Sequence, residues 1–332
     1  MLFVENVLIL NNKQQTMNAK FALKTIFISI LCLSISMQSC KKKDDTKADP
    51  DSKQHNEDVN NIKSTNDNTN NDVNNLIQNI PAFGKNTSPM AGEICGATID
   101  SSDLYDVIPT LYINFDSTVT CPLPNRKRSG TLKVELISGT RWSDVGAVLK
   151  ITHINYKVLF PDLANHYVIF NGSKYLTDVN GIDWIGVWLG SSTILLRERS
   201  YDMVVTFDNG ESSSWQTART SEWGYTASSG EVYAIVNGDT TMDGKTADSW
   251  GVTRFGTTFK TYVEQAWRSN TTCGWWRPTA GIYSSVTSGF TVKATFGTDA
   301  SGVQIGGSGC AYGFKIEWDY SGTTGSTVLG YW

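Results

Sequence analysis

The feature that most constrains the fold of this chain is an alternation of apolar and polar residues with a period of two. It is clearest in Lys150–Phe160, where one face carries Thr152, Ile154, Tyr156, Val158 and Phe160 and the other carries His153, Asn155 and Lys157. A β-strand puts alternate residues on opposite faces, whereas a helix needs a period of 3.6. We therefore expect a half-buried strand here, with His153 on its polar face.

Similar stretches recur along the chain and are separated by residues rich in Gly, Asn, Asp, Ser and Thr. They are Val107–Phe115, Thr131–Ile137, Tyr201–Asn209, Glu211–Thr220, Glu231–Val236, Gly251–Trp267, Phe290–Phe296, Ala311–Tyr320 and Ser326–Trp332. Asp208-Asn209-Gly210 predicts a tight turn between two of them. No amphipathic helical stretch longer than three turns stands out. The sequence predicts an all-β fold, either an antiparallel β-sandwich or a long twisted sheet, as one body or as lobes 81–189 and 190–332.

The segment before this β-rich region has a different composition. Thr46–Asn79 is rich in Asn, Asp, Lys and Ser and has almost no aromatic or branched apolar residues. Such a segment cannot bury enough apolar surface to offset the entropy of folding. We therefore expect residues 40–80 to form a disordered tether ahead of an ectodomain at 81–332.

Residues 1–39 contain an export signal. Lys20 and Lys24 supply a short basic region, and the following Thr25–Ser39 is uncharged and mostly apolar. This length is typical of a signal peptide and short for a bilayer span, which leaves an uncleaved membrane helix as the alternative. Met17 is a more natural start than Met1, because the basic region then lies close to the first residue.

Met37-Gln38-Ser39-Cys40 resembles the lipobox of bacterial lipoproteins, in which a small residue precedes a cysteine. The resemblance implies cleavage before Cys40 and acyl chains on its thiol. Cys32 is the competing candidate, but bulky Leu31 precedes it. Two or three acyl chains anchor a protein to a membrane far better than one chain does.

Lys43, Asp44 and Asp45 follow the cysteine closely. They resemble the lysine and two acids that direct Bacteroidota lipoproteins to the outer face of the outer membrane. The alternatives are an ordinary solvated charge run and an anchor that faces the periplasm. We expect a protein anchored in the outer membrane that faces the cell exterior.

The net charge of −4 and the lack of a basic stripe argue against a nucleic-acid partner. The one cationic cluster, Arg126-Lys127-Arg128, lies between prolines and a glycine. We expect it to form a solvated turn and not a phosphate site.

Four of the six cysteines lie outside the signal and the anchor: Cys95, Cys121, Cys273 and Cys310. An even number in an exported chain predicts disulfides, with three pairings open. Each half of the chain reads cysteine, strand, cysteine, strand, and this weak internal repeat favours Cys95–Cys121 and Cys273–Cys310. Zinc is the alternative, but no pair has the spacing of a zinc site, so we expect no metal.

Several of these blocks together resemble a family of uncharacterised Bacteroidota outer-membrane lipoproteins, of the Flavobacteria and Bacteroides type. They are Cys95-Gly-Ala-Thr-Ile, Leu111-Tyr-Ile-Asn-Phe-Asp, Arg126-Lys-Arg-Ser-Gly-Thr-Leu, Trp215–Thr220 and the Cys273 and Cys310 blocks. Asp116 stands where glycine is usual, and Pro161–Leu189 has no counterpart that we can place. The family has no assigned activity, so the resemblance implies only fold and location.

The chain has few residues suited to catalysis. His55 falls in the expected tether, His153 on a polar strand face and His166 after a turn, and no hydrolase, metalloprotease or phosphate-loop motif is present. A carboxylate pair for glycoside hydrolysis can be drawn from Asp183, Glu198, Glu222 and Asp243, as from any acid-containing chain. Asp239–Asp248 is oxygen-rich, but its spacing favours a hairpin turn over a calcium site. We expect no catalytic residue, no cofactor and no enzymatic activity.

The eleven tryptophans are the more informative feature. Exposed indoles on a sheet stack against sugar rings, and neighbouring Asn, Asp and Thr bond the hydroxyls. The candidates are Trp184, Trp188, Trp275 and Trp276, although all four can equally fill a core. We expect a binding or display protein for a glycan or an envelope partner. A glycan hydrolase and a lipid or lipopolysaccharide carrier are the alternatives.

Overall fold

The computed structural model of the protein describes residues 50–77, 80–83, 94–122, 125–161, 166–274, 277–306 and 309–331. All of them belong to one compact unit, Ala48–Trp332. The expected signal peptide, Cys40 and the export residues Lys43, Asp44 and Asp45 lie outside the described residues.

Sixteen strands in the described residues join in one antiparallel sheet, which confirms the all-β prediction. The strands are β1 Ala97–Asp100, β2 Thr110–Phe115, β3 Thr120–Pro122, β4 Asn125–Ser138, β5 Val148–Phe160, β6 His166–Asp178, β7 Ile194–Phe207, β8 Ser212–Thr226, β9 Glu231–Gly238, β10 Thr240–Met242, β11 Lys245–Val252, β12 Thr258–Asn270, β13 Ala280–Thr287, β14 Phe290–Thr298, β15 Gly313–Tyr320 and β16 Thr323–Gly330. The helices of the described residues are α2 Pro50–Ile77, the short η1 Pro81–Phe83 and α3 Trp184–Trp188.

Strands that follow one another in sequence are mostly neighbours in the sheet. One local ring interrupts this order, because β8 and β12 each pair with both β9 and β11. The sheet is continuous across Gly190, since β6 and β7 pair from Val168↔Phe207 to Asp178↔Leu196. Of the sequence-based alternatives, the long twisted sheet describes this arrangement.

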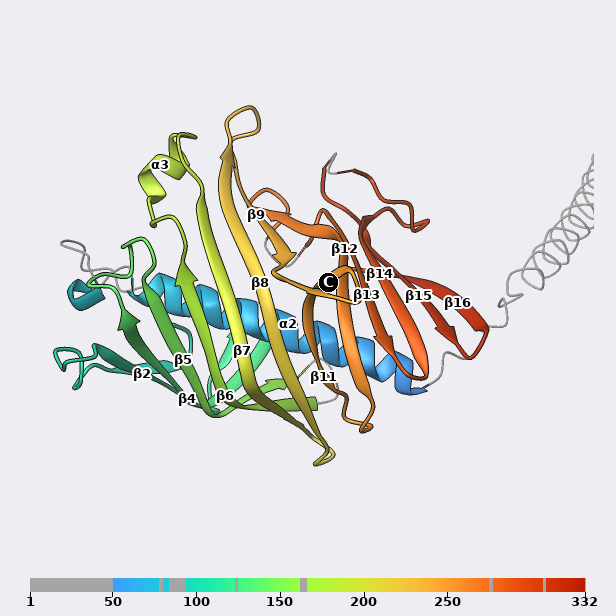
Figure 1. The fold of residues 1–332 in the computed structure, drawn as a ribbon, viewed down its shortest axis with the longest axis horizontal. Coiled ribbons are helices and arrows are strands. Elements are labelled where there is room, and N and C mark those ends of the chain that lie inside the picture. Colours follow the sequence, from blue (N-terminus) through green and yellow to red (C-terminus); the bar gives the residue numbers. More distant parts are fainter. Residues whose placement is uncertain are drawn as a thin grey trace, which may run out of the picture. The chain divides into compact units, whose positions relative to one another are not determined.

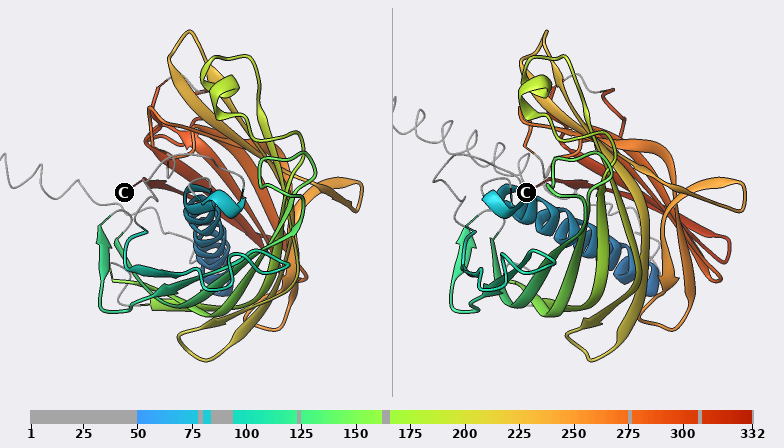
Figure 2. Two further views of the ribbon diagram at one scale, coloured as in Figure 1. Left: turned by 90° about the vertical axis from the view of Figure 1, so that its left-hand side faces the viewer. Right: turned by 60° about the vertical axis from the view of Figure 1, so that its left-hand side comes forward.

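Helix α2 lies along the inner face of the curved sheet (Figures 1 and 2). Its Val59, Ile62, Val73, Leu76 and Ile77 are buried in the same apolar cluster as residues of β2, β4, β5, β6 and β7. The prediction of a disordered tether is therefore wrong for residues 50–77. Neither α2 nor α3 has the combination of length and apolar character that a helix needs to cross a lipid bilayer.

The polar residues of α2 explain why the composition was misleading. Asn and Asp are weak helix formers, so tertiary contacts must stabilise this helix. Arg254 donates hydrogen bonds to Asp58 at 2.8 and 2.5 Å, and Lys63 Nζ lies 2.6 Å from Asp248 Oδ2. These charges are paired inside the protein instead of being solvated.

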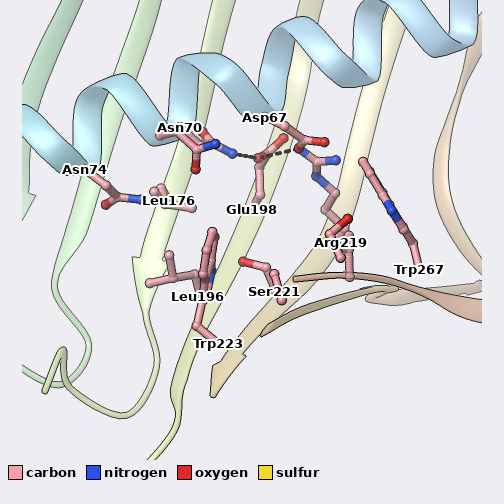
Figure 3. A pocket seen from close by; sticks show the side chains of 14 residues that line it. Asp67, Asn70, Asn74, Leu176, Leu196, Glu198, Arg219, Ser221, Trp223 and Trp267 are labelled. Atoms are coloured by element: carbon pink, nitrogen blue, oxygen red, sulfur yellow. Dashed lines mark hydrogen bonds and ion pairs between the residues drawn. The ribbon is translucent and has the colours of Figure 1, made fainter. Parts of the chain in front are cut away.

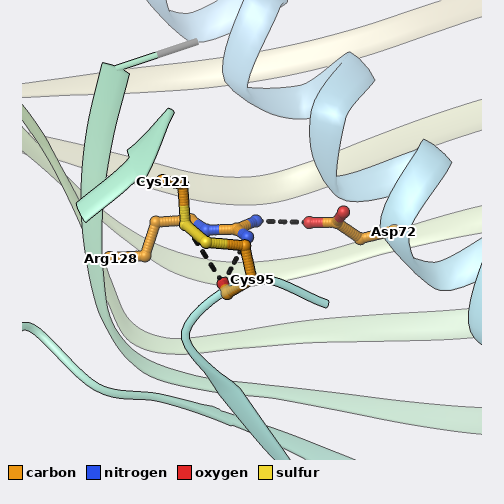
Figure 4. The surroundings of a disulfide bond; sticks show 4 residues. All are labelled: Asp72, Cys95, Cys121 and Arg128. Carbon is orange, nitrogen blue, oxygen red and sulfur yellow. Dashed lines mark hydrogen bonds and ion pairs between the residues drawn. A yellow bond between two sulfur atoms is a disulfide. The ribbon is translucent and has the colours of Figure 1, made fainter. Parts of the chain in front are cut away.

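Arg126 and Arg128 also hold α2 against the sheet. They point inward from β4: Arg126 donates to Ser64 Oγ at 2.6 Å, and Arg128 forms an ion pair with Asp72. Arg128 also donates to the carbonyl oxygen of Cys95 at 2.9 Å, which ties the helix to the Cys95–Cys121 disulfide (Figure 4). The expected solvated turn at residues 126–128 is therefore wrong.

Strand β5 contains a β-bulge that the alternation did not predict. Ile154 and Asn155 together stand opposite Asn171 of β6, and Asn155 has a φ of 47°. A bulge moves the following residues to the other face and bends the strand. Tyr156 is buried as expected, but before the bulge it is His153 that faces the core, while Ile154 is exposed.

The local predictions about disulfides and turns are confirmed. Cys95–Cys121 and Cys273–Cys310 are both bonded, with Cα–Cα distances of 5.9 and 5.2 Å. The turn at 208–210 joins β7 to β8, with Gly210 at a φ of 85°. At 239–248 the chain forms the expected hairpin, in which β10 pairs with β11 and Met242 stands opposite Lys245.

Candidate functional site

A pocket of about 70 Å³ lies between α2 and strands β6, β7, β8, β9 and β12 (Figure 3). Pockets that enclose a whole drug-sized ligand measure roughly 300–1,000 Å³. This pocket therefore has room for a few water-sized groups and can receive one end of a larger molecule.

Regular backbone periodicity brings the lining residues together. On α2, Asp67, Asn70, Asn71 and Asn74 are three, four and seven residues apart and so lie on one helix face. On β8, alternate residues reach the pocket: Arg219, Ser221 and Trp223. The same alternation presents Glu198 from β7 and Trp267 with Ser269 from β12.

Arg219 is at the centre of the site. Its Nη2 donates to Asp67 Oδ1 at 2.5 Å and to Glu198 Oε2 at 3.1 Å. Asn70 Nδ2 also donates to Glu198 Oε2. One guanidinium thus joins two carboxylates from the helix and the sheet, and Glu198 is only 3% exposed.

The two carboxylates have pKa values shifted in opposite directions. Burial alone would raise the pKa of Glu198, but Arg219 and Lys174 outweigh it and hold that pKa at about 2. Burial raises the pKa of Asp67 despite the opposing effect of Arg219. Burial also lowers the pKa of Lys174 to about 8, so this ammonium stays largely charged at neutral pH.

The charges around the pocket balance. Asp67, Glu198 and Asp248 are the acids, and Lys63, Lys174 and Arg219 are the bases that interact with them. Buried charges are tolerated only when they are compensated in this way. With three acids and three bases, the cluster has no surplus formal charge that would call for an ionic ligand.

Several buried polar atoms of the lining have no hydrogen-bond partner among the described residues. They include Asp67 Oδ2, Asn70 Oδ1, Glu198 Oε1, Ser269 Oγ and Trp267 Nε1. Buried polar atoms are nearly always hydrogen-bonded, so each of these calls for an explanation. Acceptor oxygens predominate among them, which fits a ligand that donates hydrogen bonds.

Two indoles stand on either side of this polar group. Figure 3 shows Trp223 and Trp267 with Glu198 and Arg219 between them. Both indoles are half-buried, and Trp267 stacks on Phe296 at 6.3 Å between ring centroids. Packing of this kind holds an aromatic wall rigid and lets its other face contact a ligand.

Of the four acids singled out from the sequence, only Glu198 lines the pocket. Asp183 caps α3 by accepting a hydrogen bond from the Gly186 amide at 2.9 Å. Glu222 accepts from the Tyr233 hydroxyl at 3.5 Å. Asp243 lies in an exposed turn, 2.7 Å from Lys260.

The three histidines lie apart from the pocket lining. His55 is buried in α2, 2.8 Å from Ser285 Oγ, and not in a solvated tether. His153 is buried against Tyr156 and Phe170, contrary to its expected place on a polar face. His166 is exposed beside Asp208.

Of the four tryptophans chosen from the sequence, only Trp188 has a described side chain. Trp188 is 59% exposed on α3, 6.1 Å from the Tyr225 ring, and does not line the pocket. The Trp184 side chain, Trp275 and Trp276 lie outside the described residues. Sequence reasoning missed Trp223 and Trp267, which have no local feature that distinguishes them from core residues.

The helix residues were missed for a different reason. Asp67, Asn70, Asn71 and Asn74 have helical spacing, but they lie in a segment whose composition predicted disorder. Sparse apolar residues at helical intervals, such as Val73, Leu76 and Ile77, were the available signal.

Among the described residues, no group of three or more His, Cys, Asp or Glu side chains could hold a metal ion. No protein-family model matches the chain, and comparisons with curated proteins and with solved structures give no match either.

Proposed function

We propose that this protein is a lipid-anchored protein of the outer membrane, facing the cell exterior, that binds the end of a glycan without altering it. The observation that carries the proposal is the set of unpaired buried acceptors, on Asp67, Asn70 and Glu198, beside two indoles. Glycan hydroxyls donate hydrogen bonds, and the apolar faces of sugar rings stack on indoles.

The balance of charge favours a neutral sugar over other polar ligands. A phosphate or an amine would add an uncompensated charge to a buried cluster of three acids and three bases, which costs several kcal/mol. Hydroxyl groups satisfy the free oxygens and leave that balance unchanged. The small volume restricts binding to one terminal group of the glycan.

The test is binding of the full-length protein in detergent to a glycan array, followed by calorimetric titration with the strongest ligand. A fragment that starts at Pro81 is unsuitable, because α2 supplies one wall of the pocket. Trp267→Ala is expected to weaken binding by about tenfold or more, through loss of stacking. The matched control is Trp188→Ala, which removes an exposed indole outside the pocket.

Two results would count against this proposal. One is an array on which no glycan binds, which would favour an envelope protein as the partner. The other is equal affinity of the wild type and the Trp267→Ala variant for the same glycan.

A glycan hydrolase is the second candidate, favoured by the divergent pKa values of Asp67 and Glu198. Paired acids of this kind can divide the roles of proton donor and ionised carboxylate. We rank it second because Glu198 is already held by both Arg219 and Asn70. Cleavage of a bound glycan by the wild type but not by Glu198→Gln would establish the hydrolase instead.

A lipid carrier is the third candidate. It requires an open apolar groove, whereas three charged residues, Asp67, Glu198 and Arg219, line this pocket. The site therefore supports lipid binding less well than glycan binding.

A further inference from the structure

Strand β16 forms one edge of the sheet. It pairs with β15 without interruption, from Gly313↔Gly330 to Tyr320↔Thr323. Among the described residues, no strand pairs with its other side. That side presents the unpaired N–H and C=O groups of an eight-residue strand, which can template the addition of another strand.

This edge lacks the usual protection against strand addition. Natural edges are short, carry charges or proline, or contain a bulge. The sequence of β16, Thr-Thr-Gly-Ser-Thr-Val-Leu-Gly, has no charge and no proline, and its register has no shift. The opposite edge, β1, has four residues and ends in Asp100.

Apolar side chains flank the open edge. Tyr312, Tyr320 and Leu329 are all at least 40% exposed. Trp318 lies over Gly325, where an added Cβ would be 2.4 Å from the indole. An aromatic ring over a strand glycine stabilises the edge in an extended form that is ready for pairing.

We propose that β16 pairs antiparallel with β16 of a second copy of this chain, so that the two sheets join about a two-fold axis. We choose a second copy of the chain as the partner of this open edge because the β16 sequence is complementary to itself. With the axis passing between the two Thr327 residues, each Gly325 stands opposite a Leu329 and each Ser326 opposite a Val328, so small side chains meet larger ones. The lack of charge means that two identical strands meet without repulsion.

Such an interface is isologous and closes at two copies, because each chain has one β16. Main-chain hydrogen bonds supply affinity, as in other cases of strand addition. The flanking Tyr312, Tyr320 and Leu329 add apolar area to the contact.

The experiment is sedimentation equilibrium of the full-length protein in detergent, compared with the double variant Ser326→Lys/Thr327→Lys. In the proposed register the new lysine at position 327 stands directly opposite its counterpart in the other copy. We expect a dimer for the wild type and a dissociation constant at least about tenfold higher for the variant, because opposed like charges are unfavourable. At concentrations low enough for both proteins to be monomeric, the melting temperatures should agree, since both positions are exposed on an edge strand.

The matched control is Thr98→Lys, which places one lysine on the other edge strand, β1. It should dimerise like the wild type. Hydrogen exchange provides a second readout: β16 amides should exchange more slowly as the protein concentration rises. A monomeric wild type, an undiminished dimer in the double variant, or equal loss in Thr98→Lys would each overturn the proposal.

Discussion

Arg219 of β8 and Asp67 of α2 are 152 residues apart in sequence, yet the Arg219 Nη2 lies 2.5 Å from Asp67 Oδ1. Their contact joins the helix to the sheet at the wall of the pocket. Each side chain of this pair neutralises the charge of the other, which would be costly to bury without an opposite charge nearby. The stability of the fold and the shape of the site therefore depend on the same pair.

Replacing Arg219 with glutamine should destabilise the protein strongly. It leaves the buried Glu198 and the half-buried Asp67 without their guanidinium, and breaking one side of a buried ion pair such as Arg219–Glu198 costs about 3–5 kcal/mol. The measurement is the free energy of unfolding from urea titration, in a cycle with Asp67→Asn and the double variant. Coupling of about 1 kcal/mol or more is expected for residues in direct contact.

The control for that cycle is Arg197→Gln. Arg197 also faces a carboxylate, Asp239, at 2.8 Å, but its side chain is 46% exposed. A surface pair of this kind contributes about 0–1 kcal/mol. Equal losses for Arg197→Gln and Arg219→Gln would contradict the central role of the buried pair.

Ile62→Ala tests whether α2 belongs to the core. Ile62 is fully buried, so its truncation should lower the free energy of unfolding by about 2–5 kcal/mol. Ile185→Ala on α3 is the matched control, because Ile185 is exposed and its loss should change little. A neutral Ile62→Ala variant would mean that the segment is a tether after all.

His55 should make the protein less stable as the pH falls. Burial lowers its pKa from 6.5 to about 4, so between these values the unfolded chain binds more protons than the folded one. Stability contributed by the neutral ring is therefore complete above pH 6.5 and decreases toward pH 4, by about 3 kcal/mol in total.

Asp58, in the next turn of α2, acts in the opposite direction. Burial, opposed by Arg254, raises its pKa to about 6, so acidification between pH 6 and 3.8 favours the folded state. The His55 contribution must therefore be measured as a difference. Thermal unfolding of the wild type and of His55→Gln should be measured from pH 7.5 to 4. The variant should lose less stability than the wild type as the pH falls. Parallel curves would refute the assignment.

Gly172→Ala should disrupt the sheet near the bulges of β5 and β7. Gly172 has a φ of 125°, and a Cβ there would lie 2.5 Å from the Asp202 carbonyl oxygen. We expect a loss of about 2 kcal/mol or more in stability, from backbone strain and steric overlap together. In Gly210→Ala, the matched control, the Cβ meets open space, so only the strain of about 1 kcal/mol remains.

The part of the fold that local patterns encode was predictable. Alternation predicted strands, Asp208-Asn209-Gly210 predicted a hairpin turn, and the cysteine repeat predicted both disulfides. Each of these signals depends on neighbouring residues or on a short repeated pattern. Within Lys150–Phe160 the same reasoning failed, because a two-residue bulge at Ile154 and Asn155 reverses the faces without any change in composition.

The candidate site was not predictable in the same way. Glu198 was one of four equivalent acids, and only its contact with Arg219 distinguishes it. Asp67 and Asn70 were assigned to a disordered segment. Trp223 and Trp267 line one pocket because β9 pairs with both β8 and β12, which no local pattern encodes.

The sequence by itself determined that this chain would form antiparallel strands and two disulfides, because backbone periodicity and cysteine spacing are local properties. Only the tertiary structure decided that the Asn- and Asp-rich segment 50–77 becomes a buried helix. A polar helix is stable inside a protein only when partners such as Arg128, Arg219 and Arg254 neutralise its charges. Those partners lie 56–196 residues away in sequence, and only folding brings them together.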